Sequence, residues 1–317
     1  MGNRHKFYNG ILLLDKPCGI TSHDAVAKVR HAVMQRRVGH TGTLDPRATG
    51  LLVVCMGRGT KIARFLTDMG KVYEAEVRLG QRSRTFDGEG VYEDEMPMLA
   101  PDMTAAEAQV FLDGYLGVTQ QQVPAYSAVR VDGQRLYDMA REGIEVEPPI
   151  REIEIKEISL IKYEKPNLSF RISCSKGTYI RSLANDIGKD LGCGAYLSQL
   201  RRSSVGALSI DSAISIDEVE RYHANGTLTK HLLSYDRVLP FSAFRIDNDF
   251  RKLVLSGRDV RVKDVIKVEG TFAAGDTISM KDASGQVLAV GTADADSDAF
   301  RDKDGKSKLF TYVRVLN

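Results

Sequence analysis

Residues Arg36–Gly50 read Arg-Arg-Val-Gly-His-Thr-Gly-Thr-Leu-Asp-Pro-Arg-Ala-Thr-Gly and are the most informative stretch of the chain. They follow neither a helical nor a strand period, and their glycines and proline predict a loop. Pro46 disfavours the helical region for the residue before it, so Asp45 is expected to be extended at the tip of a turn. Asp45 is the only acid here and has four basic side chains around it, Arg36, Arg37, His40 and Arg47. A carboxylate among cations stays ionised, which suits nucleophilic attack better than proton donation.

The same Asp-Pro pair also has a plain structural explanation. Asp and Pro are frequent formers of glycine-rich turns, because Asp hydrogen-bonds its own backbone and Pro pre-sets its own φ. On the loop alone the turn-former interpretation is the stronger one. The choice therefore depends on what the rest of the chain contains.

Composition bounds the class of protein. A length of 317 residues favours one large or two domains, and 43% hydrophobic residues with no Trp is typical of a soluble globular protein. No run approaches the roughly 20 apolar residues of a membrane span, and no signal sequence is recognised at the start. The four cysteines stand far apart without a C-x-x-C pair, so neither zinc binding nor a disulfide framework is indicated. We expect reduced thiols and a cytoplasmic protein.

Positive charge is concentrated around the Asp45 loop. The net charge is only +2, but His23–Arg64 holds eight Lys or Arg and two Asp, whereas Phe241–Asn317 holds thirteen basic and twelve acidic residues. A charge run is often just a solvated face. Clustered Lys and Arg are also how proteins bind nucleic-acid phosphates, and this becomes the better explanation if the loop motif is functional.

Alternating strands and interspersed helices predict an α+β fold. In Lys71–Leu79 the apolar face carries Tyr73, Ala75, Val77 and Leu79, the period of a half-buried strand. On that spacing alone Tyr73 is a core residue. A strand that ends in a turn is expected at 10–17, and further strands at 51–56, 153–155 and 168–174. Helices are expected from the caps at 21–24 through Val33, and at 60–66, 104–115 and 179–191.

Two segments stand apart from this main pattern. Residues from about 121 to 150 are rich in Arg, Tyr and Gly without a core-facing period, so we expect an inserted loop segment. After Leu239-Pro240 the composition shifts to short β-rich runs, at 260–262, 277–280, 287–290 and 310–315, with a solvated loop at 294–307. This predicts a catalytic domain over 1–240 and a small β-rich domain over 241–317, with few contacts between them.

The loop motif G-H-T-G-T-L-D-P-x-A-T-G resembles the catalytic loop of the TruB family of pseudouridine synthases. Similar stretches follow in the family's order over nearly the whole chain. They are Leu13–Ser22, Lys71–Ala75, Ser175–Leu183 and Leu200–Gly206. Several multi-residue matches in the right order outweigh the turn-former explanation of Asp45.

The resemblance implies a role for each site residue. Asp45 would be the nucleophile, Arg181 its charge partner, and Tyr73 the stacking platform for the target base and a candidate base. The helix pattern alone would let Arg181 extend to solvent. The implied substrate-binding residues are His40, Tyr179, Leu200 and Arg130, of which Arg130 stands where the family commonly has Lys.

The implied function is a tRNA pseudouridine synthase that modifies the T-loop uridine at position 55. The resemblance implies no cofactor and no metal, a PUA-like RNA-binding domain at 241–317, the tRNA T-stem-loop as partner, and no membrane. The oligomeric state is open, with a monomer as the working expectation. It is also open whether Asp45 attacks ribose C1′ or the uracil ring.

Two alternatives stay open. One is a guide-RNA-dependent pseudouridine synthase subunit of a ribonucleoprotein, and the other is a non-catalytic RNA-binding or RNA-folding protein. A further motif, Gly57-Arg58-Gly59-Thr60-Lys61, hints at a phosphate-binding loop. It lacks the G-x-x-x-x-G-K-[ST] order, so nucleotide hydrolysis is not expected.

Overall fold

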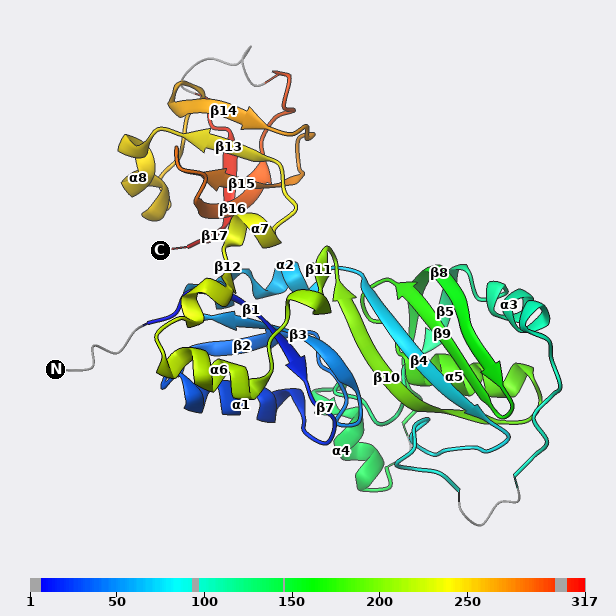
Figure 1. Ribbon diagram of the computed structural model, residues 1–317. Helices are drawn as coiled ribbons and strands as arrows, with labels where there is room; N and C mark the ends of the chain where they lie inside the picture. Colours follow the sequence, from blue (N-terminus) through cyan, green and yellow to red (C-terminus); the bar gives the residue numbers. More distant parts are fainter. Residues whose placement is uncertain (1–6, 93–96, 145, 300–306, 317) are drawn as a thin grey trace.

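The computed structural model describes residues 7–92, 97–144, 146–299 and 307–316. Within them a large mixed sheet carries helices on its faces, and the C-terminal part forms a smaller sheet that stands beside one end of it (Figure 1). The predicted α+β class is confirmed. No helix in these residues has the length and apolar content needed to cross a bilayer.

The large sheet has ten strands. They are β1 (Gly10–Lys16), β2 (Val38–Thr41), β3 (Thr49–Met56), β4 (Lys71–Leu79), β5 (Gly117–Gln122), β8 (Ile150–Glu164), β9 (Asn167–Cys174), β10 (Ala195–Val205), β11 (Leu208–Ser209) and β12 (Leu232–Leu233). Their order is β12-β1-β3-β10-β4-β9-β8-β5, with β2 on β3 and β11 on β10. All pairs are antiparallel except β3 with β10, where Thr49 lies opposite Arg201 and Gly50 opposite Arg202.

Helices cover the two halves of this sheet separately (Figure 1). The α-helices are α1 (Ser22–Ala32), α2 (Ala63–Thr67), α3 (Ala105–Asp113), α5 (Ile180–Asp190), α6 (Ile216–Ala224) and α7 (Tyr235–Val238), and the 3-10 helices are η1 (Gly57–Ile62), η2 (Ile210–Ser212) and η3 (Leu228–His231). Capping boxes start α1 at Thr21 and α3 at Thr104, since each side-chain oxygen satisfies a free backbone N–H. The helix predicted at 60–66 is split between η1 and α2.

The alternation predicted for β4 is present, with every second side chain from Lys71 to Leu79 buried. Tyr73 belongs to the core cluster built by β4, β9 and α5, in which Phe170, Ile172 and Ile187 are fully buried. Tyr73 also lines the cavity described below. It is therefore held by the core while one edge faces that cavity.

The predicted insertion lies between β5 and β8. It contains a short hairpin of β6 (Arg130–Val131) and β7 (Gln134–Arg135), followed by α4 (Leu136–Arg141). Figure 1 shows α4 and β7 below the middle of the large sheet, outside the sheet itself. Its hairpin and helix are short, which explains why no core-facing period marks it in the sequence.

Two predictions of local structure need correction, and a third lies partly outside the described residues. The Arg36–Gly50 stretch is not all loop, because Val38–Thr41 forms β2 and β3 begins at Thr49. Although the sequence shows no strand period here, β2 is held in a strand conformation by pairing with β3, with Val38 opposite Met56. Residues 260–262 are not a strand but a single bridge at Arg261 and the start of a 3-10 helix. The loop predicted over 294–307 is confirmed over 294–298, where the backbone forms bends and turns, and residues 300–306 lie outside the described residues.

The C-terminal sheet has five strands in the order β14-β13-β15-β16-β17. Its elements are β13 (Ala243–Ile246), η4 (Asn248–Phe250), α8 (Arg251–Leu255), η5 (Val262–Asp264), β14 (Val265–Glu269), β15 (Thr277–Lys281), β16 (Val287–Ala293) and β17 (Phe310–Val315). It has its own core, in which Phe244, Met280 and Phe310 are fully buried.

As expected, few contacts between strands and helices cross from one part to the other, but those present include apolar ones. Val287, Val290 and Leu316 of the C-terminal part share one hydrophobic cluster with residues of the large sheet and its helices, Ile62 and Leu66 among them. Burial of apolar side chains from both sides of the Leu239-Pro240 turn against each other lowers the free energy of the folded state relative to leaving them exposed to water. The composition shift therefore marks a change of sheet, across which a small apolar contact is made.

We expect a chain that ends at Pro240 to be less stable than the full-length chain. Removal of Val290 and Leu316 exposes Ile62 and Leu66, which should cost the remaining part about 2 kcal/mol. At this size that lowers Tm by about 4–8 °C, measured by circular dichroism. The control is Ile266→Ala, since that side chain is 54% exposed and should leave Tm unchanged. An equal Tm for truncated and full-length chains would contradict a shared core.

Candidate active site

A cavity of about 1100 Å³ lies where the Asp45 loop, β4, β10, the start of α5 and the insertion meet. It brings Asp45 together with aromatic, apolar and charged side chains from distant parts of the chain. Of the residues predicted from the sequence for catalysis or substrate binding, the cavity is lined by Asp45, Tyr73, Tyr179, Arg181 and Leu200. His40 and Arg130 do not line it.

The turn at Asp45 is built by the residue types that the sequence shows there. The Ala48 N–H donates to the Asp45 carbonyl at 3.1 Å, which makes Asp45 the first and Pro46 the second residue of a β-turn. Asp and Pro are favoured at those positions. The turn-former interpretation is thus confirmed, and the same residue also places its carboxylate in the lining of the cavity.

The N-terminal motif holds this loop from one side. Lys16 is fully buried, and its Nζ donates to the carbonyls of Pro17 and Ile20 at 2.8 Å and of Pro46 at 3.3 Å. Burial lowers the pKa of Lys16. Ser22 Oγ donates to the Leu44 carbonyl at 3.0 Å and accepts from the Leu44 N–H at 2.8 Å. These contacts fix the backbone on both sides of Asp45.

Arg202 holds the loop from the other side. Its side chain is 1% exposed, and it donates from Nε to the Leu51 carbonyl and from Nη2 to the Gly42 carbonyl, both at 2.8 Å. The approach of β10 to β3 also requires glycine at position 50. Gly50 has φ +100°, and a Cβ there would lie 2.3 Å from the Arg202 carbonyl oxygen.

Asp45 and Arg181 form a two-point ion pair. Arg181 Nε lies 2.9 Å from Oδ2 as an ionic contact without hydrogen-bond alignment, and Nη2 donates to Oδ1 at 3.2 Å. The Arg181 side chain is 7% exposed and that of Asp45 38%. The cation is therefore inside the protein while the carboxylate is open to the cavity. Arg181 does not extend to solvent as its helix position alone would allow.

Arg181 also donates to two backbone carbonyls. Nη1 donates to the Thr85 carbonyl at 3.1 Å, and Nη2 donates to the Tyr126 carbonyl at 3.0 Å. Because a buried guanidinium is costly unless its donors are paired, this network defines one orientation for Arg181. It also connects the insertion, through Tyr126, to the Asp45 pair.

A second carboxylate was missed by the sequence reasoning. Asp87 Oδ2 lies 3.8 Å from Arg181 Nη1, and the Asp87 side chain is 13% exposed. Thr85 Oγ1 donates to Asp87 Oδ1 at 2.5 Å. The only signal in the sequence is an acid in a glycine-containing loop after β4, which is too common a pattern to identify it. Arg202 and Lys16 lie inside matched motifs, but nothing in their spacing shows what they hold.

Tyr73 and Tyr179 approach the cavity differently. Tyr73 is 8% exposed, and desolvation raises the pKa of its phenol, so the hydroxyl is protonated at neutral pH. Tyr179 precedes α5, and Gln121 holds its backbone by accepting from the N–H at 2.8 Å and donating to the carbonyl at 3.0 Å. Leu200 lines the wall on β10.

His40 and Arg130 lie elsewhere. His40 is in β2 opposite Val54, its Nδ1 is buried without a partner among the described residues, and burial lowers its pKa. The imidazole is therefore neutral at pH 7. Arg130 is exposed on the hairpin and donates to the Gly133 carbonyl at 2.6 Å. From the same hairpin Arg135 lines the cavity instead.

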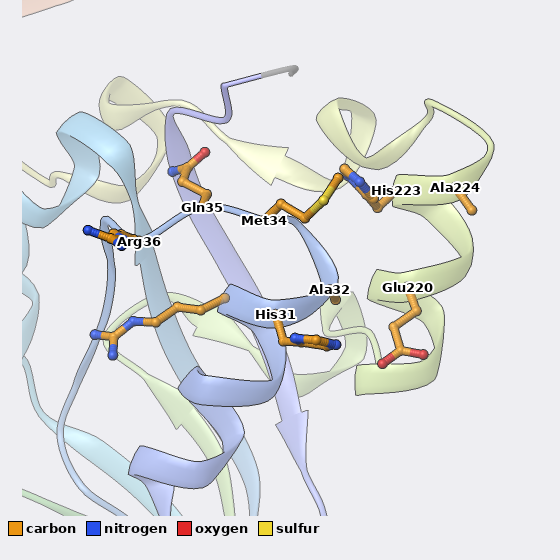
Figure 2. A pocket seen from close by; sticks show the side chains of 9 residues that line it. His31, Ala32, Met34, Gln35, Arg36, Glu220, His223 and Ala224 are labelled. Atoms are coloured by element: carbon orange, nitrogen blue, oxygen red, sulfur yellow. The ribbon is translucent and has the colours of Figure 1, made fainter. Parts of the chain in front are cut away.

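A second hollow, of about 990 Å³, lies between the ends of α1 and α6. Figure 2 shows its side chains on the end of α1, on the segment that follows α1 and on α6, with Arg36 pointing away from Glu220. Chemistry needs groups that converge on one point, and the Asp45 cavity has such a set. We therefore take the Asp45 cavity as the candidate active site.

Models of known families match most of the chain. The model described as TruB family pseudouridylate synthase (N terminal domain) matches residues 30–180, and that of the tRNA pseudouridylate synthase B C-terminal domain matches residues 181–240. A PUA domain model matches residues 243–309. The cavity is built from residues within the first two matches and from Thr21 just before them.

Curated proteins named tRNA pseudouridine synthase B are similar over nearly the whole chain. That of Bacillus licheniformis is 41% identical over 292 residues, with 89% of this chain and 92% of the relative covered. That of Bacillus subtilis is 40% identical over 288 residues with the same coverage. That of Burkholderia lata is 39% identical over 280 residues, covering 88% of this chain and 85% of the relative.

Solved structures share the fold. A chain in the crystal structure of the archaeal box H/ACA sRNP Nop10-Cbf5 complex has a TM-score of 0.75 at 21% identity, covering 98% of this chain and 86% of that chain. A chain in a Cbf5-Nop10-Gar1 complex has a TM-score of 0.76 at 24% identity, covering 97% and 85%. The sequence matches, the curated relatives and the shared fold agree with the geometry of the cavity, and the chain belongs to the TruB family of pseudouridylate synthases.

Proposed function

We propose that this protein is a tRNA pseudouridine synthase that isomerises the T-loop uridine at position 55. The observation that carries the proposal is the Asp45–Arg181 pair, in which a carboxylate open to a cavity is held at two points by a buried guanidinium. The names of the curated relatives supply tRNA as the substrate. The C-terminal part, which matches a PUA domain, is proposed to bind RNA and do no chemistry.

The reaction breaks the N1–C1′ bond of uridine and forms a C5–C1′ bond, while the C5 proton is lost and N1 gains one. A uridine stacked in folded RNA must first be flipped out, at a cost of a few kcal/mol. Stacking on Tyr73 would recover roughly 1–3 kcal/mol of that cost. Leu200 and Tyr179 would complete the apolar walls around the flipped base.

Asp45 is proposed as the nucleophile. Arg181 pairs with this carboxylate at two points and orients it in the cavity, and both ribose C1′ and the uracil ring remain candidate targets of its attack. The raised pKa of Tyr73 leaves little phenolate at neutral pH, which favours the stacking role over that of a resting base. His40 stays a proposed contact for nucleotides around the flipped base.

The insertion is proposed to grip the RNA. Its cations include Arg130, Arg135 and Arg141, and Arg141 lies over the Tyr137 ring at 4.8 Å. Tyr126 and Tyr137 pack edge to face at 6.4 Å. Because the Tyr126 carbonyl accepts from Arg181, RNA contacts made by the insertion can affect the catalytic pair directly.

The cell compartment and oligomeric state follow as proposals. Cys55, Cys174 and Cys193 are buried and Cys18 is exposed, all as free thiols, in keeping with a cytoplasmic enzyme. All the proposed catalytic residues come from one copy of the chain, so we expect a monomer to be active.

The first test is conversion of unmodified tRNA by the purified chain without guide RNA. Wild type should form pseudouridine at position 55, and Asp45→Asn should form none while binding tRNA within several-fold of wild type. Asp102→Asn, at a side chain that is 89% exposed, is the control and should stay fully active. Product from the Asp45→Asn variant would reject the nucleophile, and binding without turnover by wild type would favour a non-catalytic RNA-binding protein. Strict dependence on a guide RNA would favour the ribonucleoprotein subunit.

A second prediction separates charge from geometry at Arg181. Arg181→Met should lower kcat by about 100-fold or more, the effect expected when a group that organises the transition state is lost. Arg181→Lys should recover only part of this, because an ammonium cannot make the two-point contact. Asp87→Asn should cost less, since its contact with Arg181 is 3.8 Å. Lys189→Met, on the exposed face of the same helix, is the control, and a wild-type kcat for Arg181→Met would refute the role.

A third prediction concerns the insertion. If two or three of its arginines neutralise phosphates, Arg130→Gln/Arg135→Gln/Arg141→Gln should bind tRNA with a logarithmic salt slope shallower by about 2–3. The control removes the same charge at Lys156, Lys162 and Lys189, whose ammonium groups lie beside carboxylates. The two slopes are measured by filter binding from low to moderate salt. Equal slopes would show that the insertion does not neutralise the RNA backbone.

A further inference from the structure

The wall that the insertion adds to the Asp45 cavity carries a hydroxyl group to which the proposed mechanism gives no task. Ser127 lines this cavity and is only 5% exposed. Its Oγ is buried and has no hydrogen-bond partner among the described residues. A hydroxyl that leaves water without gaining a partner costs folding free energy. The presence of serine at this position therefore needs an explanation.

The fold itself makes no use of this hydroxyl. The Ser127 N–H donates to the Ala125 carbonyl at 3.1 Å, and the Ser127 carbonyl accepts from the Tyr137 N–H at 3.0 Å. The carbonyl of the residue before it, Tyr126, accepts from Arg181 Nη2 at 3.0 Å. These backbone contacts hold Ser127 in place whatever its side chain is. Alanine would meet the needs of the fold at least as well.

Ser127 stands close to the proposed nucleophile. Arg181 Nη2 donates to Asp45 Oδ1 at 3.2 Å as well as to the Tyr126 carbonyl, so one nitrogen atom links the carboxylate to the residue that precedes Ser127. Rotation about the Cα–Cβ bond moves Oγ among three staggered positions. A group placed for attack by Asp45 is therefore near a hydroxyl that can turn to meet it.

The surroundings of Ser127 limit what it can recognise. Beside it along the chain, Ala128 and Val129 present apolar side chains to the same cavity. An uncharged hydroxyl in such a wall can both donate and accept one hydrogen bond, and a few polar groups of this kind fix the orientation of a ligand in a pocket. A flipped uridine offers matching uncharged oxygens, namely the two uracil carbonyls and the ribose 2′-hydroxyl.

We propose that Ser127 Oγ hydrogen-bonds an oxygen of the flipped uridine and is a specificity-determining residue of the cavity. The inference rests on the proposed function, which places a uridine beside Asp45. The nucleotide then supplies the partner that the hydroxyl lacks in the free protein. An active site that keeps a polar group ready for its substrate does so at a cost in stability. Replacement of Ser127 should therefore change activity and stability in opposite directions or leave stability unchanged.

The test compares Ser127→Ala with a matched control, Ser279→Ala. Ser279 Oγ is likewise buried without a partner among the described residues, in a residue that is 1% exposed, but it lies on β15 of the C-terminal sheet. Because each change removes an unpaired hydroxyl, neither should lower Tm. On a T-stem-loop hairpin with uridine at the target position, Ser127→Ala should have a kcat/KM about tenfold below wild type, as expected for the loss of one hydrogen bond. Ser279→Ala should equal wild type.

A second hairpin, with 2′-deoxyuridine at the target position, identifies the oxygen through the Kd of each protein. A weaker affinity of Ser127→Ala for the uridine hairpin alone assigns the 2′-hydroxyl, and an equal loss for both hairpins assigns a uracil carbonyl. Unchanged kcat/KM and Kd in Ser127→Ala would overturn the proposal. A lowered Tm would overturn it too, because the hydroxyl would then serve the fold. Failure of the proposed function is seen separately, as absence of pseudouridine from the uridine hairpin with wild-type protein.

Discussion

The active site depends on one short contact between backbones, the parallel pairing of β3 with β10. Arg202 lies there between Gly50 of β3 and Tyr73 of β4. The Arg202 carbonyl lies so close to Gly50 that no residue with a Cβ fits at that position. The Arg202 guanidinium donates a hydrogen bond to the Gly42 carbonyl. The contact joins two halves of a sheet that each have their own helices. It thereby brings the Asp45 loop of one half against Tyr73 and Arg181 of the other.

The local patterns of the sequence predicted local structure well. Alternation over β4, the capping boxes of α1 and α3, and the turn at Asp45 depend on neighbours within a few residues, which a period or a motif can reveal. The strand β2 was missed because Val38–Thr41 owes its conformation to pairing with β3. The strand expected at 260–262 was wrong for the converse reason, since its β-branched residues have no partner strand beyond a bridge at Arg261.

For the site as well, sequence patterns could predict local structure but not the contacts between residues far apart in the chain. Resemblance to a family pointed to Asp45, Tyr73 and Arg181, and the structure brings these three to one cavity. Residue patterns alone would have left Tyr73 in the core and Arg181 in solvent. The Asp45–Arg181 ion pair joins residues that are 136 positions apart. The roles of Lys16, Asp87 and Arg202 likewise depend on their partners, which are carbonyls or a guanidinium from other segments of the chain. No spacing in a single sequence carries that information.

The apolar cluster shared by the large sheet and the C-terminal part has a consequence for the thermodynamics of recognition. Two binding surfaces joined by a flexible linker lose orientational freedom when both engage one ligand. Here part of that freedom is lost on folding, because apolar side chains of both parts pack in one cluster. The surface proposed to bind RNA on the C-terminal part is thereby held next to the large sheet. Preorganisation of this kind lets weak contacts add to affinity. If both parts bind RNA as proposed, an RNA helix whose length or bend does not match this arrangement would contact only one surface at a time.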